Sequence, residues 1–456
     1  MKNYKNLIIG FGKGGKTLAG ALASAGQSVA LVEASEKMYG GTCINVACIP
    51  TKSLEHSARM ARYQGGSFTD KSERYRQAIE RKNELTAFLR GKNYEKAVSA
   101  GVEVIVGTAS FIDSHRVLVQ LADGREEEIG AERFFINTGA RPFIPSIPGL
   151  SSSRFAYISE TMMELSVLPE KLVIIGGGYI GLEFASYYLN FGSEVTIIQD
   201  GETFIPREDA DIAASVLASL ENRGARVIRS AKTDHITDLE SSAIVHVITA
   251  DGMEDLPANA ILVATGRRPN VNGLNLEAAG VKLTERGAVR TDEHLRTTAD
   301  NIWAMGDVVG GLQFTYISLD DSRIVRSSLL GDGSRTTANR GEVPYSVFLD
   351  PPFSRVGMTE AQAREKGYNV KIAKLPAAGI PKARVLRQTD GLLKAVIDAD
   401  TNKLLGVHLF CADSHEMINV AKMAIDAGLP YTVLRDAIYT HPTMSEACND
   451  LFASIS

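Results

Sequence analysis

Residues 5–33 read KNLIIGFGKGGKTLAGALASAGQSVALVE, and this stretch decides the predicted fold. An apolar strand over 5–10 leads into Gly10, Gly12 and Gly15 and then into an apolar helical stretch over 16–25. A second strand, 29–33, ends in Glu33. Glycines at this spacing allow a tight turn and let the backbone approach a pyrophosphate at a helix N-terminus, while the acid binds a ribose. The stretch therefore predicts a dinucleotide-binding unit.

The pattern recurs at residues 171–199, KLVIIGGGYIGLEFASYYLNFGSEVTIIQ. The second set of glycines is Gly176, Gly178 and Gly181, followed by a predicted helix over 182–191 and a predicted strand over 194–199. The third glycine and the end of the second strand are 18 residues apart in both copies, Gly15 to Glu33 and Gly181 to Gln199. Two copies predict two dinucleotides in one chain, as when a nicotinamide nucleotide reduces a flavin nucleotide.

Three further strands end where backbone can approach a cofactor. In RFFINTGARP (133–142) and in ILVATGRRPN (261–270), the predicted strand ends in Thr-Gly. In DNIWAMGDVVGG (300–311), Asp307 follows Ala-Met-Gly. Residues 340–456 change to strands followed by helices, which predicts a separate α+β domain. The polar stretch 65–77 is predicted to be a surface loop between helices.

Composition limits the class of protein. The length of 456 residues predicts about three domains, and a net charge of −5 argues against a nucleic-acid or anionic-membrane binder. No stretch free of charged residues reaches the roughly 18 residues of a membrane span. Four cysteines exclude a disulfide framework and predict a reducing, cytoplasmic location.

Two cysteines lie close together in MYGGTCINVACIPTK (38–52), where four residues separate Cys43 from Cys48. The segment runs into a predicted helix over 53–63, so Cys48 is expected near a helix N-terminus, where the macrodipole and Lys52 favour a thiolate. Thiols one helical turn apart can close a disulfide. Structural zinc usually needs four ligands, and there is no second close pair of cysteines. Inert buried cysteines are the other alternative, and a redox-active disulfide is favoured over both.

Taken together, these motifs resemble one family. GGTCINVACIPTK, the two glycine fingerprints, ATGRRPN, AMGDVVGG and HPTMSE (441–446) resemble, in family order, the flavin-dependent pyridine nucleotide–disulfide oxidoreductases. That family includes dihydrolipoamide dehydrogenase, glutathione reductase and mercuric reductase. The chain is most similar to the bacterial copper(II)-reducing branch that confers resistance to reactive chlorine. The segments that carry this closer likeness are 39–52, 301–326, 344–348, 351–360 and 410–419.

The resemblance implies an α/β fold with two Rossmann-like dinucleotide-binding domains and a C-terminal α+β dimerisation domain. The implied FAD domain is discontinuous, 1–150 and 266–339, the NAD(P) domain is 151–265, and the dimerisation domain is 340–456. The residues implied to bind FAD are Gly10, Gly12, Gly15, Glu33, Thr42, Lys52, Gly139 and Asp307. Those implied to bind NAD(P) are Gly176, Gly178, Gly181, Gln199 and Gly266.

The resemblance also implies catalytic roles. Cys48 is implied to be the charge-transfer thiol beside the flavin, and Cys43 the interchange thiol that faces the acceptor. Lys52 and Glu183 resemble an ion pair near the flavin position where hydride arrives.

His441 and Glu446 resemble the acid–base pair that reaches the disulfide of a partner subunit, which implies a homodimer with shared active sites. A carboxylate fixes the imidazole tautomer and raises its basicity, so that Cys43 can exchange a proton near neutral pH.

Departures from the family narrow the predicted function. Ala47 stands where the family often has glycine, and Gln199 followed by Asp200 stands where NAD-using relatives have a ribose-binding acid. The C-terminus, LFASIS, has no cysteine pair, so a dedicated mercury reductase is not expected.

The prediction is an FAD-dependent NAD(P)H oxidoreductase that reduces Cu(II), held transiently by the thiols of Cys43 and Cys48, in defence against hypochlorous acid. A disulfide reductase is the alternative. A redox sensor without turnover is disfavoured, because the set of reactive residues is complete.

Two more groups carry sulfur. Cys411, His415, Glu416 and Met417 form a conceivable soft-metal site, although a helix start with packed neighbours is the favoured interpretation. Cys448 is interpreted as a buried helix cysteine.

Overall fold

The computed structural model describes residues 1–455 and divides the chain into two compact units. The first unit comprises residues 1–53, 79–144 and 266–340, and the second comprises 54–78, 145–265 and the residues from 341 onward. Helices α3 (Cys48–Gln64) and α4 (Phe68–Ser99) contribute residues to both. Within residues 1–455, none of the helices has the length and apolar character needed to cross a membrane.

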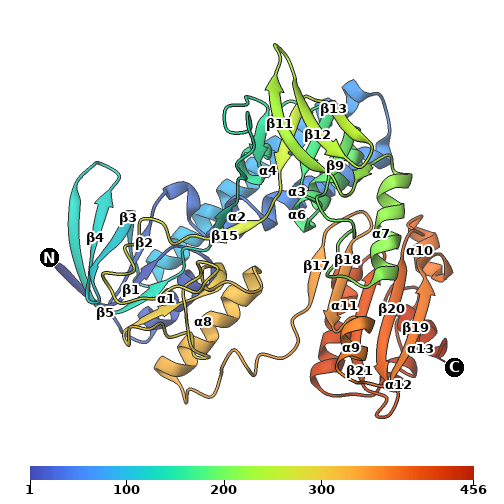
Figure 1. The fold of residues 1–456 in the computed structure, drawn as a ribbon. Helices are drawn as coiled ribbons and strands as arrows, with labels where there is room; N and C mark the ends of the chain where they lie inside the picture. The colour runs from blue at the N-terminus through green and yellow to red at the C-terminus, as the bar shows by residue number, and fades with distance from the viewer. Residues whose placement is uncertain (456) are drawn as a thin grey trace. The chain divides into compact units, whose positions relative to one another are not determined.

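The first unit is built on a parallel sheet in the order β3-β2-β1-β5-β16. Strand β4 pairs antiparallel with both β3 and β5, and β6 pairs with β15 in a separate ribbon. The strands are β1 (Lys2–Ile9), β2 (Val29–Glu33), β3 (Glu103–Asp113), β4 (Arg116–Leu121), β5 (Glu126–Ile136), β6 (Ala140–Pro142), β15 (Arg267–Pro269) and β16 (Ile302–Ala304) (Figure 1). The helical segments of this unit are α1 (Lys13–Ser24), η1 (Glu36–Met38), α2 (Thr42–Asn45), η2 (Gly306–Val309) and α8 (Thr315–Leu330).

Alternation along β1 gives this sheet two buried faces. Ile8 is fully buried in a cluster that includes residues of α1 and α8, whereas its neighbours Leu7 and Ile9 belong to a cluster on the other side of the strand. Successive side chains of a strand point to opposite faces, so a continuous apolar strand predicts a sheet that is covered on both sides. Trp303, interpreted here as a core residue, is 4% exposed.

The second unit contains a parallel sheet in the order β10-β9-β8-β14-β7 and a three-stranded antiparallel sheet, β11-β12-β13. The strands are β7 (Ala156–Ile158), β8 (Lys171–Ile175), β9 (Glu194–Ile198), β10 (Arg226–Ile228), β11 (Lys232–Asp238), β12 (Ala243–Thr249), β13 (Gly252–Ala258) and β14 (Ala260–Val263). The helices that accompany them are α5 (Ser159–Met162), α6 (Tyr179–Phe191) and α7 (Ala210–Asn222).

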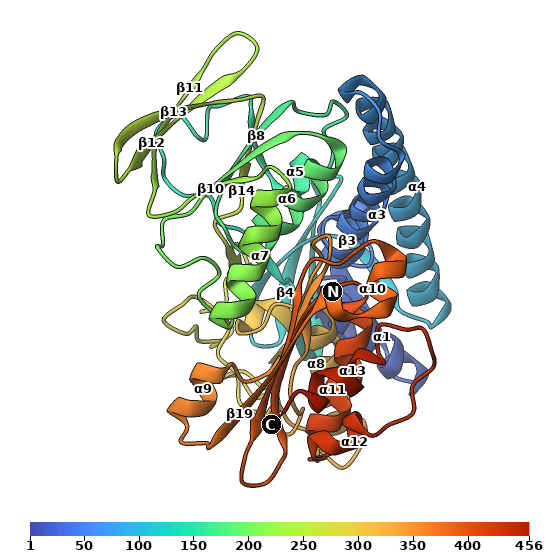
Figure 2. The same cartoon turned by 90° about the vertical axis from the view of Figure 1, so that its right-hand side faces the viewer.

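The C-terminal part of the second unit is an antiparallel sheet in the order β17-β18-β21-β20-β19. Helices α11 and α13 pack on one face of it, close together in Figure 2, and their apolar residues share a core with the strands. The strands are β17 (Tyr345–Val347), β18 (Phe353–Gly357), β19 (Val370–Pro376), β20 (Leu392–Asp398) and β21 (Leu404–Phe410). The helical segments are α9 (Glu360–Glu365), η3 (Ala377–Gly379), α10 (Pro381–Leu386), α11 (Ser414–Asp426), α12 (Tyr431–Arg435) and α13 (Ala447–Ala453).

The predicted surface loop at 65–77 is wrong for most of its length, because α4 begins at Phe68. Ser67 and Asp70 form a capping box: the Asp70 carboxylate accepts from the Ser67 backbone N–H at 2.9 Å, and the Ser67 hydroxyl accepts from the Asp70 N–H at 3.2 Å. This arrangement satisfies two backbone donors that a helix start otherwise leaves unpaired. The polar composition of the segment concealed a helix N-terminus.

A buried ammonium joins the two larger sheets of the second unit. Lys394 on β20 is 1% exposed, and its Nζ donates to Asp209 at 2.6 Å, to Asp211 at 2.9 Å and to Glu360 at 2.8 Å. Asp209 and Asp211 lie at the start of α7, and Glu360 begins α9. These three carboxylates have the spacing of a cation site, and the lysine supplies the counter-charge.

Replacing Lys394 by Met is expected to lower the free energy of unfolding by roughly 3–5 kcal/mol, because three carboxylates lose their buried counter-charge. Urea denaturation of the holoenzyme followed by circular dichroism measures the difference. The control is Lys374→Met, since Lys374 contacts Asp211 at 2.7 Å but is about half exposed and is expected to cost no more than about 1 kcal/mol. Equal losses in the free energy of unfolding of the two variants would contradict the assignment of Lys394 as the buried counter-charge.

The contribution of Lys394 to the free energy of unfolding is also predicted to depend on pH. The bond to Lys394 lowers the pKa of Glu360, and bonds to Lys374 and Lys394 lower that of Asp211. A lowered pKa gives stability that is present above the unfolded-state pKa of about 4 and is lost as pH falls further. The difference between the parent and Lys394→Met is therefore expected to shrink on acidification.

Candidate active site

The first glycine loop is formed by close contact between two strand ends. Gly10, at φ +103°, follows β1, and a Cβ there would lie 2.4 Å from the carbonyl oxygen of Asn137, which follows β5. The Asn137 side chain is buried, accepts from the Gly15 N–H at 2.8 Å and donates to the Met305 carbonyl at 2.7 Å. This amide holds the loop to the start of α1. The sequence analysis did not single out Asn137, although it is the polar residue that ends an apolar strand.

The acid after β2 is placed as a dinucleotide site requires. Glu33 accepts from the Phe11 N–H at 2.8 Å, next to the glycine loop, and burial raises the pKa of its carboxyl. Asp307 lies in η2, and burial raises its pKa as well, while Arg267 opposes the change. Two partly buried carboxylates and a side-chain-free loop at a helix N-terminus fit the adenosine, pyrophosphate and ribitol of FAD.

The second glycine loop repeats the geometry of the first. Gly176 has φ +114°, and a Cβ there would lie 2.5 Å from the Ala264 carbonyl oxygen at the end of β14. A Cβ on Gly181 would lie 2.2 Å from the Gly176 carbonyl oxygen, as one on Gly15 would lie 2.5 Å from that of Gly10. The duplicated sequence therefore folds into duplicated cradles.

Gln199, which follows β9, is buried with its amide group oriented. Its Nε2 donates to the Gly201 carbonyl at 3.1 Å and to the Thr203 carbonyl at 2.7 Å. The acceptor Oε1 faces Gly177, where a Cβ would lie 2.5 Å from it. An amide oxygen accepts from a ribose hydroxyl and offers nothing to a phosphate. Asp200 is exposed and accepts from the Gly201 N–H at 2.9 Å.

The cysteine segment packs directly on the first glycine loop. A Cβ on Gly41 would lie 2.6 Å from the Cα of Gly12, so the backbones touch. Thr42 and Cys43 belong to α2, and Cys48 is the first residue of α3, as expected. Asn45 ties the turn by donating to the Tyr39 and Gly41 carbonyls at 3.0 and 2.9 Å. The thiols thus lie beside the dinucleotide cradle.

The two thiols are hydrogen-bonded to one another. The pKa of Cys43 is raised, first by this bond, then by burial and by the charge of Cys48. Cys48 lies at the N-terminus of the 17-residue helix α3, where the dipole favours an anion. Ala47 has no positive φ, and its carbonyl accepts from the Thr51 N–H at 3.0 Å, so the departure from glycine causes no strain.

Thr315 and Lys16 complete the surroundings of the thiols, and neither was predicted to be part of the site. The Thr315 hydroxyl, at the start of α8, lies 3.4 Å from the Cys48 Sγ and also hydrogen-bonds Cys43. Lys16 donates to the Gly40 carbonyl at 3.2 Å and to Asn93. Burial lowers the pKa of Lys16 to about 8, and attraction to Cys43 opposes that shift. Lys16 directly follows the first glycine motif and Thr315 lies in the 301–326 segment, but neither spacing indicates a contact with the thiols.

The predicted Lys52–Glu183 ion pair stays a prediction. Lys52 donates to the Thr51 hydroxyl at 3.2 Å in the first unit, and Glu183 accepts from the Phe348 N–H at 2.9 Å in the second. Gly139 and Gly266 have φ of +71° and +116°, and no atom lies near their Cβ positions, which leaves both strand ends open for a cofactor.

His441 and Glu446 are brought together as predicted. Nδ1 of His441 lies 2.8 Å from Glu446 Oε2, and the imidazole side chain is 72% exposed. A carboxylate at Nδ1 fixes the tautomer with the proton on Nδ1, which leaves Nε2 as a base directed to solvent. An exposed, oriented base is suited to a reacting group that another molecule supplies.

The remaining sulfur-containing residues lie among packed neighbours. Cys411 is fully buried with its Sγ 3.9 Å from Met417 Sδ, and His415 lies against the Phe348 ring. Burial raises the pKa of Cys448 to about 11. Within residues 1–455, the groups of three or more His, Cys, Asp or Glu that could hold a metal include none of the four cysteines. The interpretation of Cys411, His415 and Met417 as packed neighbours at a helix start therefore agrees with their contacts.

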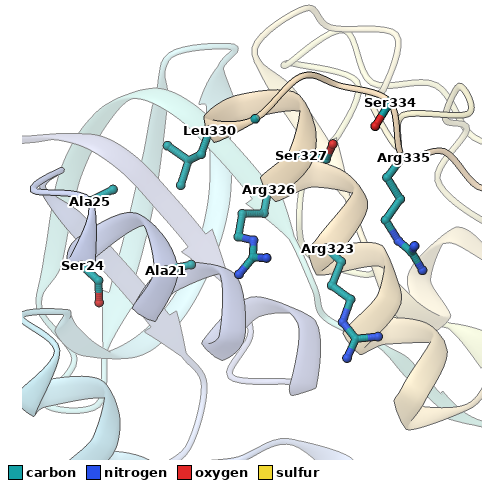
Figure 3. Close-up of a pocket in the computed structure, with 10 residues that line it drawn as sticks. Ala21, Ser24, Ala25, Arg323, Arg326, Ser327, Leu330, Ser334 and Arg335 are labelled. Atoms are coloured by element: carbon teal, nitrogen blue, oxygen red, sulfur yellow. The ribbon is translucent and has the colours of Figure 1, made fainter.

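A separate surface depression lies between α1 and α8 (Figure 3). Its charged lining comes from Arg323, Arg326 and Arg335, of which Arg335 forms an ion pair with Asp320. None of the predicted site residues lines it.

Comparisons with known proteins identify the family of the chain. Residues 4–322 match the pyridine nucleotide-disulphide oxidoreductase family, and residues 343–452 match its dimerisation domain. RclA of Escherichia coli (strain K12), a probable pyridine nucleotide-disulfide oxidoreductase, is 52% identical over 456 residues that cover all of both chains. Mercuric reductase of Bacillus cereus is 33% identical over 97% of this chain and 70% of its own. Dihydrolipoyl dehydrogenase of Mycobacterium tuberculosis (strain H37Rv) is 32% identical over 99% of this chain and 98% of its own.

A solved structure supports the same relationship. The Cu(II) complex of the HOCl-induced flavoprotein disulfide reductase RclA from Escherichia coli has a TM-score of 0.93 and 51% identity, covering 99% of each chain. The chain therefore belongs to the pyridine nucleotide-disulphide oxidoreductase family. It is an α/β, NAD(P)H-dependent flavoprotein oxidoreductase whose cofactors are FAD and NAD(P)H. Its dimerisation domain supports a homodimer.

Replacing Lys16 by Met is expected to slow alkylation of Cys43 roughly threefold to tenfold at pH 7, because the ammonium that favours the thiolate is removed. Since the pKa of Lys16 is about 8, its charge is present below that pH and lost above it. The effect should therefore fade as pH rises through 8. Iodoacetamide kinetics in a Cys48→Ser background measure it.

The control for Lys16 is Lys37→Met, because Lys37 is an exposed lysine near the same segment. It should leave the alkylation rate unchanged across the pH range. A pH-independent loss in the Lys16 variant would contradict an electrostatic role.

For nucleotide preference, NADH is expected to be favoured over NADPH in kcat/KM by roughly threefold, because Gln199 presents an acceptor to the ribose. Asp200→Asn should narrow that ratio by a few-fold, since an exposed charge contributes at most about 1 kcal/mol. Glu202→Gln is the control. A strong preference for NADPH would show that neither group faces the nucleotide.

Proposed function

We propose that the chain transfers electrons from NAD(P)H through Cys43 and Cys48 to Cu(II), and that it serves in defence against hypochlorous acid. The observation that carries the proposal is the pair of hydrogen-bonded thiols beside the glycine cradle, with Lys16 and Thr315 around them. The Cu(II) complex of RclA, which is about half identical to this chain, supports the choice of acceptor. We also propose the three-domain division given above.

In this proposal the residues divide the work. The first glycine loop, Glu33 and Asp307 would hold FAD, which would supply the chemistry of hydride acceptance and two-electron transfer next to the disulfide. Cys48 faces the flavin, because its position at the start of α3 favours the thiolate. Cys43 faces the acceptor, and the Lys52–Glu183 pair lies near the site of hydride arrival.

The redox balance with copper is two metal ions per dithiol. Closing the Cys43–Cys48 dithiol to a disulfide releases two electrons and two protons, which reduces two Cu(II) to two Cu(I). Thiolates are soft ligands, so they bind the Cu(I) product better than a hard site would. The protons go to solvent and to nearby bases.

A disulfide reductase is the second candidate, and the His441–Glu446 pair favours it. An imidazole held at 2.8 Å by a carboxylate is what a leaving thiolate needs for proton delivery. We propose that this pair acts on the thiols of the partner subunit in a homodimer. We further propose that the protein works in the cytoplasm, where its four cysteines would remain reduced.

The thiol roles predict a difference in colour. Reduced Cys43→Ser should keep a long-wavelength charge-transfer band, whereas Cys48→Ser should lose it, because only a thiolate that touches the flavin gives the band. Anaerobic absorption spectra of the two reduced variants measure this. The reverse pattern would exchange the two assignments.

The acceptor is tested by anaerobic NAD(P)H consumption with Cu(II), Hg(II), oxidised glutathione and lipoamide. Reduction of Cu(II) should be fast and should fall sharply in either cysteine variant, while reduction of oxidised glutathione should be negligible. Assays without enzyme and with the Cys43→Ser/Cys48→Ser double variant are the controls, because free flavin and simple thiols also reduce copper. If the double variant reduces Cu(II) as fast as the parent, the copper proposal is wrong.

His441→Ala separates the two candidates. Disulfide reduction needs proton delivery to the leaving thiolate, so it should fall on the order of 10²-fold or more. Electron transfer to a thiolate-bound metal ion releases no thiol leaving group, so the rate of Cu(II) reduction should fall much less in this variant. Equal losses with both acceptors would remove the distinction and favour the disulfide reductase.

A further inference from the structure

The depression between α1 and α8 is lined by positive charge and by no acid. Arg323 and Arg326 on α8 and Arg335 in the loop that follows supply three guanidinium groups, and none of the lining residues is an aspartate or a glutamate (Figure 3). The chain as a whole has a net charge of −5. Arginines that gather in one depression of an acidic chain are therefore a local feature that does not follow from its composition.

Two of the three guanidinium groups are not compensated by a neighbouring charge. Arg323 and Arg326 are exposed, and within residues 1–455 neither side chain forms an ion pair or a hydrogen bond. They are three residues apart on α8, so like charges occupy neighbouring positions on one helix face, an arrangement that opposes helix formation. Arg335, by contrast, forms an ion pair with Asp320. The depression therefore holds two positive charges that a bound anion would stabilise.

The positions of the two arginines do not suit helix capping. A basic side chain that stabilises a helix C-terminus lies in the last turn, where it meets the final carbonyl groups. The last turn of α8 contains no basic residue, and neither does that of α1. Arg323 lies seven residues before Leu330, the end of α8. Neither Arg323 nor Arg326 therefore serves as a helix cap.

The depression is large enough for a small molecule. Its volume is about 1010 Å³, and ligand sites typically have about 300–1,000 Å³. The wall that α1 supplies consists of Ala21, Ser24 and Ala25, whose short side chains leave the space in front of the arginines open. Asp332, in the loop after α8, is engaged within that loop, because it accepts from the Ser334 N–H at 3.0 Å and from the Ser334 hydroxyl at 2.8 Å.

The depression is separate from the cradle of the first glycine loop. Helix α8 begins at Thr315, which contacts Cys48, and Arg323 and Arg326 follow eight and eleven residues later. A rise of about 1.5 Å per residue places them roughly 12–17 Å farther along the helix. On α1, the glycine loop lies at the N-terminal end, whereas Ser24 is the last residue. A ligand in the depression would therefore lie outside the FAD cradle.

We propose that the depression binds a diphosphate group, held by the guanidinium groups of Arg323 and Arg326. Each planar guanidinium can donate two parallel hydrogen bonds to the oxygens of one phosphoryl group, so two of them on neighbouring positions of a helix match two linked phosphoryl groups. The diphosphate belongs either to inorganic pyrophosphate or to a nucleoside diphosphate, whose remaining atoms the volume of the depression can hold. This site uses neither Cys43 nor Cys48 and does not depend on the acceptor proposed above.

The competing explanation is that the two arginines are ordinary solvated surface charges. In that case, any pair of exposed arginines at the same spacing would attract a diphosphate equally well. Arg384 and Arg387, at the end of α10, are exposed and also three residues apart, but they do not line the depression. Replacing either pair by glutamine changes the net charge equally, so a difference in affinity between the two double variants measures the contribution of the depression.

The experiment uses the FAD-loaded protein with saturating NAD⁺, so that both glycine cradles are occupied. Inorganic pyrophosphate and ADP are titrated separately and followed by calorimetry at about 0.15 M salt, where long-range attraction is screened. We expect one binding site per chain for at least one of the two probes. Arg323→Gln/Arg326→Gln should weaken binding at least tenfold, whereas Arg384→Gln/Arg387→Gln should change the affinity less than twofold.

The two probes distinguish the sources of the diphosphate. An affinity for pyrophosphate equal to or above that for ADP identifies the inorganic ion, and tighter binding of ADP identifies a nucleoside diphosphate. Arg323→Lys/Arg326→Lys keeps both charges but loses the paired donors, so it should still bind several-fold more weakly than the parent. With the fold retained by circular dichroism, absence of binding by both probes, equal weakening in the two glutamine double variants, or undiminished binding in the lysine double variant would overturn the proposal.

Discussion

The structure depends on the contact of one backbone with another at the ends of parallel strands. Gly10 approaches the chain at Asn137, and Gly176 approaches it at Ala264, at distances that leave no room for a Cβ. These contacts bring the glycine turn, the following helix N-terminus and a Thr-Gly strand end to one edge of each sheet. The contact between Gly41 and Gly12 then brings the cysteine segment to the first cradle. Without these approaches, the motifs would remain separate features of the sequence.

Much of the fold was predictable because it follows local rules. The strand over 29–33 was predicted with the bounds that the structure gives to β2, and the predicted sequence of strands followed by helices in 340–456 is confirmed by β17 to β21 and the helices α11 to α13. The helix of the second repeat begins three residues earlier than predicted, at Tyr179, because the third glycine lies inside the first turn. The prediction of a loop over 65–77 was wrong because α4 begins at Phe68. Polar residues there accept hydrogen bonds from backbone donors at the helix start, which composition alone does not reveal.

The site was predictable where one segment contains its parts. Cys43 and Cys48, the glycines and His441 with Glu446 all lie in short motifs with a chemical reason for their spacing. Asn137 and Thr315 contact those motifs from segments that are distant in the sequence, and Lys16, which directly follows the first glycine motif, reaches the cysteine segment only because the chain folds back on itself. The orientation of the Gln199 amide depends on the Gly201 and Thr203 carbonyls, so its chemistry followed from the folded loop and not from the residue type.

The buried lysine on β20 has a consequence for motion within the second unit. Its three carboxylate partners come from the starts of α7 and α9, so sliding the C-terminal sheet past α7 would separate a buried ammonium from its counter-charges. Such a separation is costly in a low-dielectric interior. Moving β20 away from α7 and α9 therefore requires that three charged hydrogen bonds break together, which opposes such a displacement within the second unit.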